Sequence, residues 1–260
     1  MSRRLCGDAF LLAAGVSVVL SALVAVSSDL HLFGDGSWYL LNLAATRRYA
    51  YWIGDWPTQF FQSRIGDYLV TQTPVLVAIH LGVHSLRALS KIYGISLWLA
   101  VLLPVWICLR LSRSPLDRLF PVIGLIAGTM NGAAFLVAES HLVAAFYWAI
   151  LFLLLFGDER STGRTRLLVA LSAPLLLCYE SMLFFGVILA LVCLDRRRTA
   201  ATGGPLYLGL AAWHLVAAAL AAAAILWPFD PTNRQGFLAA MIGLLTRSDH
   251  LGAQVSIVCL

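Results

Sequence analysis

The chain has 260 residues, of which 60% are hydrophobic and only 12% are charged, and its mean hydropathy is +0.85. A soluble domain of this length would need more charge to cover its surface, so the composition excludes an ordinary soluble enzyme and predicts an all-α, polytopic transmembrane helical bundle. The net charge of +5 comes almost entirely from arginines in short clusters between apolar runs. This pattern is typical of membrane topology signals and gives no indication of nucleic-acid binding.

The first apolar run, at 9–27, follows Arg3 and Arg4 and predicts a retained transmembrane helix with the N-terminus in the cytoplasm. It leads into an outer loop over 28–91, which begins with the polar and aromatic segment HLFGDGSWYLLNLAATRRYAYWIGDWPTQFF. The apolar spacing and the many Trp and Tyr residues predict amphipathic helices at the membrane interface, one of them over 73–88. An aromatic belt with no further role is the alternative interpretation of this segment.

Further apolar runs of about the length of a membrane span lie at 92–109, 119–138, 142–156 and 206–227. The chain ends with AQVSIVCL inside an apolar run, which is typical of a truncated membrane protein. The sequence therefore predicts one transmembrane domain over 1–260 in the inner membrane of a bacterium. The scattered cysteines show neither metal-ligand spacing nor a disulfide framework.

The run at 167–194 is too long for one crossing. Pro174 disrupts a helix and Glu180 is costly in lipid, so we expect two short helices, 167–178 and 181–194, that meet at Tyr179 and Glu180. This hairpin keeps the arginine clusters in the cytoplasm, which follows the positive-inside rule. The clusters comprise Arg110, Arg113, Arg118, Arg160, Arg164, Arg166, Arg196, Arg197 and Arg198.

Three acidic positions stand out for chemistry. Asp35 follows a glycine where the first span reaches the outer surface, and Gly36 behind it leaves the backbone free to turn. Glu139 and His141 form the turn AESHL between two spans, where both groups are suited to proton transfer or metal binding, although any turn needs polar residues. Glu180 near the middle of the membrane is either functional or the cap of a helix break.

This arrangement resembles the integral-membrane glycosyltransferases of the GT-C fold, a superfamily that includes oligosaccharyltransferases and protein O-mannosyltransferases. The resemblance implies that Asp35 in the first outer loop is catalytic and that Glu139 belongs to a second acidic motif. The motif here is E-x-H instead of the commoner D-x-D or D-x-E, so the resemblance does not decide whether the protein binds a metal ion. Asp35, Glu139 and His141 are the candidate ligands, and Mg²⁺ or Mn²⁺ is the candidate ion.

The implied activity is transfer of a sugar from a polyprenyl-phosphate donor to a glycan, lipid or protein acceptor at the outer face of the cell envelope. The phosphate leaving group gains negative charge, which Arg47, Arg48 and Arg64 are suited to bind, with His141 and Glu180 as further substrate-binding candidates. Headgroup binding by these arginines is an equal alternative.

His80 and His84 are spaced for one helix face, but no third metal ligand accompanies them. The rival function is a non-enzymatic transporter, flippase or assembly subunit. Transporters usually show broken helices in matching halves, and this sequence has one broken element, near Pro174, without a counterpart in its first half.

Overall fold

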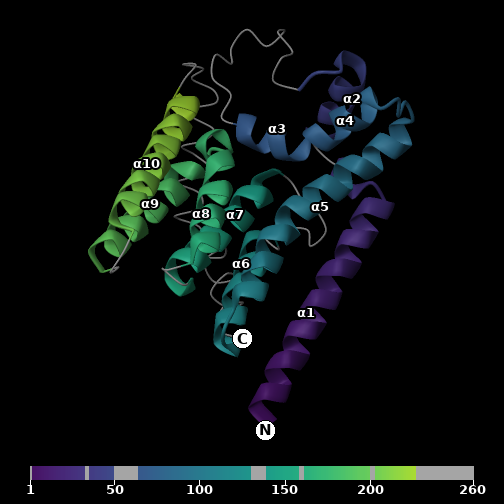
Figure 1. Ribbon diagram of the computed structural model, residues 1–260. Coiled ribbons are helices and arrows are strands. Elements are labelled where there is room, and N and C mark those ends of the chain that lie inside the picture. Colours follow the sequence, from purple (N-terminus) through teal and green to yellow (C-terminus); the bar gives the residue numbers. More distant parts are fainter. Residues whose placement is uncertain are drawn as a thin grey trace, which may run out of the picture.

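The computed structural model describes residues 2–32, 35–49, 64–129, 139–157, 161–199 and 203–226, and every regular element among them is a helix (Figure 1). The elements are α1 (Ser2–Ser27), η1 (Leu30–Leu32), α2 (Asp35–Thr46), α3 (Ile65–Thr71), α4 (Thr73–His80), α5 (Leu86–Leu111), α6 (Pro115–Thr129), α7 (Glu139–Phe156), α8 (Thr162–Ser172), η3 (Ala173–Leu177), α9 (Met182–Thr199) and α10 (Gly204–Leu226). The expectation of an all-α fold is confirmed.

Two of the described helices are long and apolar enough to cross a bilayer: α5 over Leu86–Leu111 and α10 over Gly204–Ala224. Shorter apolar helices cover Leu11–Ser27 and His141–Phe156. A buried core helix of a soluble protein has the same length and composition, so these helices give weak support to a membrane protein.

The helices enclose two hydrophobic cores that share α5. The N-terminal core lies among α1 to α5 and includes Leu43, Val75 and Tyr93, which are at most 1% exposed. The C-terminal core lies among α7, α8, η3, α9 and α10 and includes Ile150 and Leu168, both 0% exposed. Because α5 packs against both α4 and α7, it forms the boundary between the two cores.

Serine side chains cap the N-termini of three of the described helices. The Ser114 hydroxyl accepts a hydrogen bond from the Asp117 N–H at 3.1 Å, and the Asp117 carboxylate accepts one from the Ser114 N–H at 3.1 Å. This reciprocal pair is a capping box for α6, and the hydrogen bond from the Ser114 hydroxyl is the main cause that lowers the pKa of Asp117. Ser85 and Ser161 accept the N–H three residues ahead in α5 and α8.

The single surface helix expected over 73–88 is wrong. α4 ends at His80 and α5 begins at Leu86, with Gly82 between them at a φ of +89°. Glycine adopts this left-handed conformation without steric cost and commonly ends a helix. Ser85 then caps the start of α5, so this connection divides the apolar pattern into two helices.

The long run at 167–194 is divided as well. α8 ends at Ser172, the short helix η3 follows, and α9 begins at Met182, with Tyr179 and Glu180 in the connection. Pro174 lies at the start of η3, where its missing N–H costs no helical hydrogen bond. The connection thereby brings Tyr179 and Glu180 to the end of the bundle that carries α3.

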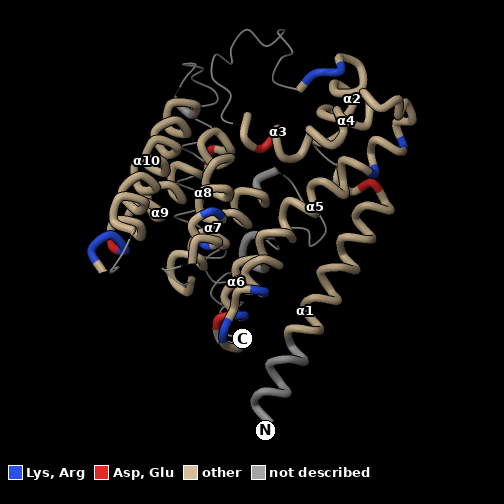
Figure 2. Tube along the Cα trace, viewed as in Figure 1, with Lys and Arg blue, Asp and Glu red and all other residues tan. Residues whose placement is uncertain are grey.

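The opposite end, which we call the arginine end, is where α7 and α9 finish and α8 and α10 begin. Arg164 donates from Nε to the carbonyl of Leu153 at 2.7 Å and from Nη1 to the hydroxyl of Tyr207 at 2.9 Å. Arg196 donates to the carbonyl of Leu155 at 2.8 Å. The Leu155 carbonyl lies in the last turn of α7, whereas the Leu153 carbonyl also accepts the N–H of Gly157 at 3.2 Å. Cations are favoured at this end of α7 by the helix dipole. Figure 2 shows the Lys and Arg positions along the trace.

Candidate functional site

A cluster of one arginine, one glutamate and three tyrosines lies at the α3 end, between the two cores. Arg64, just before α3, donates from Nε to Glu180 Oε1 at 3.4 Å, from Nη1 to the Tyr39 hydroxyl at 3.2 Å and from Nη2 to the Tyr179 hydroxyl at 3.5 Å. Tyr68 donates to the Tyr39 hydroxyl at 3.3 Å. We call these five residues the Arg64 cluster. It joins segments more than 100 residues apart, because Arg64 and Glu180 are separated by 116 positions.

The cluster holds its charges partly out of water. The side chains of Arg64 and Glu180 are 26% and 29% exposed, and the guanidinium lies 4.5 Å from the centre of the Tyr179 ring. Burial alone would lower the pKa of Arg64, but its electrostatic interactions with Tyr179, Glu180 and Tyr39 together raise it. The guanidinium therefore stays cationic, and it is positioned by aromatic rings and by a carboxylate.

Close backbone packing positions α3 against the helix break. A Cβ on Gly66 would lie 1.9 Å from the carbonyl oxygen of Pro174, so only glycine allows this approach. The next residue, Asp67, is 0% exposed, although a buried carboxylate is costly. Sequence reasoning missed Asp67; the signal was an acidic residue inside the otherwise apolar and aromatic pattern of α3.

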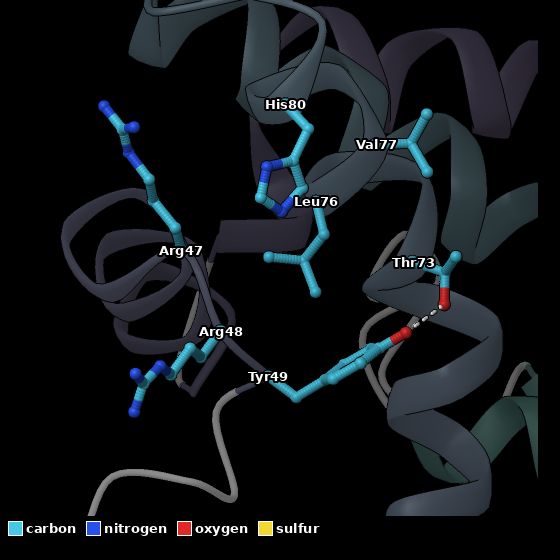
Figure 3. A pocket seen from close by; sticks show the side chains of 7 residues that line it. All are labelled: Arg47, Arg48, Tyr49, Thr73, Leu76, Val77 and His80. Atoms are coloured by element: carbon cyan, nitrogen blue, oxygen red, sulfur yellow. Dashed lines mark hydrogen bonds between the residues drawn. The ribbon is translucent and has the colours of Figure 1, made fainter.

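A cavity of about 530 Å³ lies between the end of α2 and α4 (Figure 3). Its lining residues are Arg47, Arg48, Tyr49, Thr73, Leu76, Val77 and His80. Tyr49 is held by a hydrogen bond of 2.9 Å between its hydroxyl and that of Thr73. Leu76 and His80 face the turn that carries the two arginines (Figure 3). The cavity thus combines cationic groups from the turn after α2 with apolar groups from α4.

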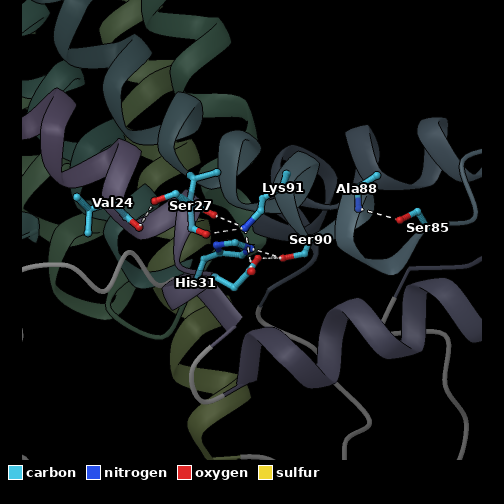
Figure 4. A network of polar contacts seen from close by, with 9 residues as sticks. Val24, Ser27, His31, Ser85, Ala88, Ser90 and Lys91 are labelled. Atoms are coloured by element: carbon cyan, nitrogen blue, oxygen red, sulfur yellow. Dashed lines mark hydrogen bonds and ion pairs between the residues drawn. The ribbon is translucent and has the colours of Figure 1, made fainter.

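A second polar network ties the end of α1 to the start of α5 (Figure 4). The ammonium of Lys91 donates to the carbonyls of Val26 and Ser27 at 2.8 and 3.0 Å and pairs with Asp29 at 2.8 Å. A cation at a helix C-terminus satisfies open carbonyls and interacts favourably with the helix dipole. Hydrogen bonds from Lys91 and Ser90 lower the pKa of Asp29. Lys91 therefore caps α1.

His31 completes this network. Ser90 donates its single hydroxyl hydrogen to Asp29, so its oxygen accepts from His31 Nε2 at 3.1 Å. Nδ1 then carries the lone pair, is buried and has no partner among the described residues. The ring packs on Gly94, where a Cβ would lie 2.6 Å from Nδ1. Burial is the main cause that lowers the pKa of His31 from its usual 6.5.

We expect protonation of His31 to make the stability of the fold depend on pH. Because its pKa is lower in the folded state, the stabilisation is complete above its unfolded pKa of 6.5 and is lost as the pH falls toward the folded value. Thermal unfolding of the detergent-solubilised chain should therefore occur at lower temperature as the pH falls from about 7 to about 5. His31→Gln, which keeps a donor but does not titrate, should flatten this dependence. The exposed His84→Gln is the control, and equal slopes in both variants would contradict the assignment.

The structure brings two of the predicted site residues together and leaves others apart. Arg64 and Glu180 meet in the Arg64 cluster, whereas Arg47 and Arg48 line the separate cavity. His141 lies, partly buried, in the first turn of α7, so the predicted turn AESHL is helical from Glu139 onward.

The structure describes the backbone of the two predicted catalytic acids but not their side chains. Asp35 begins α2 and Glu139 begins α7, and both side chains lie outside the described part of the structure. The role expected for Gly36 is wrong: it lies within α2, and a Cβ there would be 2.1 Å from the carbonyl oxygen of His31. Close packing of α2 on η1 therefore explains this glycine.

Metal binding finds no further support in the described residues. Their His, Cys, Asp and Glu side chains form no group of three that could hold an ion. His80 ends α4 while His84 lies in the connection to α5, so the two do not share a helix face.

No protein-family model matches the chain, and no curated protein or solved structure matches it either. The function of the chain is therefore inferred from the residues of the Arg64 cluster and of the cavity.

Proposed function

We propose that the chain is a multi-pass membrane glycosyltransferase that moves a sugar from a polyprenyl-phosphate donor to an acceptor at the outer face of a bacterial inner membrane. The observation that carries this proposal is the Arg64 cluster. It joins the polar segment after α1 to the break between α8 and α9, at the end of the helices opposite the arginine end. A lipid-linked substrate presents its headgroup at such an end.

The distribution of charge supports the orientation. The helix ends that flank the short connections at the arginine end carry Arg164, Arg166 and the three arginines of the last turn of α9. Basic residues of short connections are enriched on the cytoplasmic side, so the arginine end would face the cytoplasm and the α3 end would face outward. The N-terminus of α1 would then also lie in the cytoplasm.

The chemistry requires a base and a group that stabilises the leaving phosphate. The acceptor hydroxyl attacks the anomeric carbon, and a new C–O bond forms as the bond to the lipid phosphate breaks. In the proposal Asp35 takes the hydroxyl proton, and the phosphate leaves with the bonding electrons. Arg64 has the rigid fork of donors that suits a phosphate, and the tyrosines offer hydroxyls and ring faces to a sugar.

The first test is sugar transfer from a polyprenyl-phosphate donor in membranes that contain the full chain. Arg64→Gln should lower transfer about 10²-fold, as expected when a donor to developing negative charge is lost. The exposed Arg87→Gln, at the start of α5, is the matched control and should transfer normally.

A double variant separates catalysis from packing. Arg64→Gln alone leaves Glu180 without its cation, whereas Arg64→Gln/Glu180→Gln removes both charges and keeps neutral hydrogen-bonding groups. If the pair only stabilises the fold, the double variant recovers transfer, and the proposal fails. If Arg64 binds the donor, the double variant unfolds at the normal temperature and still transfers poorly.

A further inference from the structure

We propose that the cavity between α2 and α4 binds the phosphate group of a membrane lipid. This inference does not depend on the glycosyltransferase proposal, because it rests on the residues of the cavity alone. The polyprenyl-phosphate donor and an anionic glycerophospholipid share the required chemistry: a phosphate ester attached to a hydrocarbon chain.

The cavity offers cations that no described carboxylate neutralises. Arg47 and Arg48 are adjacent and exposed, and among the described residues neither forms an ion pair. His80 lines the same cavity from the last turn of α4. A guanidinium group can form paired hydrogen bonds with phosphate oxygens, which distinguishes arginine from lysine at such sites. Figure 3 shows the two groups extended in different directions from the turn, so the exposed side chains would turn toward a bound phosphate.

The backbone conformation of Arg47 sets where its side chain leaves the end of α2. Arg47 follows the last residue of α2 with a φ of +56°, a left-handed conformation that is strained for residues other than glycine. The chain has glycine at two comparable positions, Gly82 and Gly203, and an aspartate at a third, Asp29, with a φ of +55°. This conformation lets the Arg47 N–H donate to the Leu43 carbonyl at 2.9 Å, which ends α2 and places the Arg47 side chain at the mouth of the cavity.

The opposite wall of the cavity favours a lipid over free phosphate. Leu76 and Val77 lie beside the cations, and Val77 is 49% exposed. The Tyr49 ring, held by Thr73, adds a further apolar face. Leu81, one turn beyond Val77, is 80% exposed, so apolar surface continues away from the cavity along α4. A hydrocarbon chain next to the phosphate would cover this surface, whereas inorganic phosphate would leave it exposed.

The test is direct binding to the full chain purified in an uncharged detergent. The probes are dihexanoyl phosphatidic acid, farnesyl phosphate, dihexanoyl phosphatidylcholine and inorganic phosphate. We expect the first two to bind and phosphatidylcholine and inorganic phosphate to bind at least about 10-fold more weakly, because each lacks either the net phosphate charge or the chain. Preference between the first two identifies the source of the lipid. Equal binding of inorganic phosphate would overturn the lipid assignment.

Two variants separate binding from folding. Arg47→Gln/Arg48→Gln should weaken binding of dihexanoyl phosphatidic acid by about 10- to 100-fold. Arg197→Gln/Arg198→Gln, an exposed adjacent pair in the last turn of α9, is the matched control and should bind normally. Arg47→Gly relieves the backbone strain, so it should keep or raise the unfolding temperature and still weaken binding. Normal binding by Arg47→Gly and by the double variant would overturn the proposal.

Discussion

Replacement of Asp35 by asparagine is expected to lower sugar transfer by about 10²–10⁴-fold, which is the usual contribution of general-base catalysis. Asparagine keeps the size and hydrogen bonding of the side chain but cannot accept the hydroxyl proton. Asp35 begins α2, three positions after Leu32 ends η1, and Lys91 caps the preceding end of α1. The measurement is the initial rate of transfer from a polyprenyl-phosphate donor in membranes that contain the full chain.

The matched control for this variant is Asp195→Asn. Asp195 is exposed near the end of α9, at the arginine end, and its replacement should leave transfer unchanged. The amount of inserted protein should be the same for both variants, because substitutions of exposed or terminal polar residues usually change stability little. Transfer by Asp35→Asn at the level of the control would remove the catalytic role of Asp35 and favour a transporter or an assembly subunit.

Replacement of Arg164 by alanine is expected to lower the free energy of unfolding by about 3 kcal/mol, because a buried charged donor and its packing are lost together. Arg164 is only 4% exposed and bonds to the Leu153 carbonyl and the Tyr207 hydroxyl. Its guanidinium also lies 5.7 Å from the centre of the Tyr207 ring. The variant should therefore loosen the contact between α7, α8 and α10. Denaturant unfolding in detergent micelles measures the change.

Arg166→Ala provides the comparison, since Arg166 lies on the same helix and is exposed. Its stability should stay within about 0.5 kcal/mol of the parent chain, as is usual for surface substitutions. If the two variants unfolded alike, the buried bonds of Arg164 would contribute nothing measurable, and the arginine end would be held by apolar packing alone.

The sequence predicted the features that depend on local chemistry. Apolar length alone indicates α5 and α10, and the interruption near Tyr179 and Glu180 could be expected from Pro174 and from the length of the run. The gathering of Arg164 and Arg196 at one end could be anticipated from the charge pattern. These signals depend on residue type and spacing, so no tertiary contact is needed to detect them.

The Arg64 cluster could be predicted only in part. Arg64 and Glu180 were separately candidates for substrate binding, but nothing in the sequence indicates that they pair. Their contact depends on the close approach of α3 to η3, which the missing side chain of Gly66 allows. The tyrosines join through packing between the two cores, and such packing leaves no periodic signal in the chain.

The cavity and the His31 network could not be predicted from the sequence for a different reason. The sequence predicts phosphate binding by Arg47 and Arg48, but it offers His80 only as a metal ligand. The cavity forms because Gly82 ends α4 and leaves His80 in its last turn, facing α2. His31 has no marked motif around it, and its burial follows from the space above Gly94. Both features depend on the tertiary placement of a glycine.

The bond between Arg164 and Tyr207 also constrains synthesis of the chain. The ribosome adds Tyr207 43 residues after Arg164, so the guanidinium meets its first acceptor on α7 well before its second acceptor on α10 exists. Until α10 emerges, one face of this arginine has no hydroxyl partner. A chain that has not yet reached Tyr207 therefore leaves Nη1 of Arg164 without this acceptor. The C-terminal core is therefore complete only after α10, the last described helix, has been synthesised.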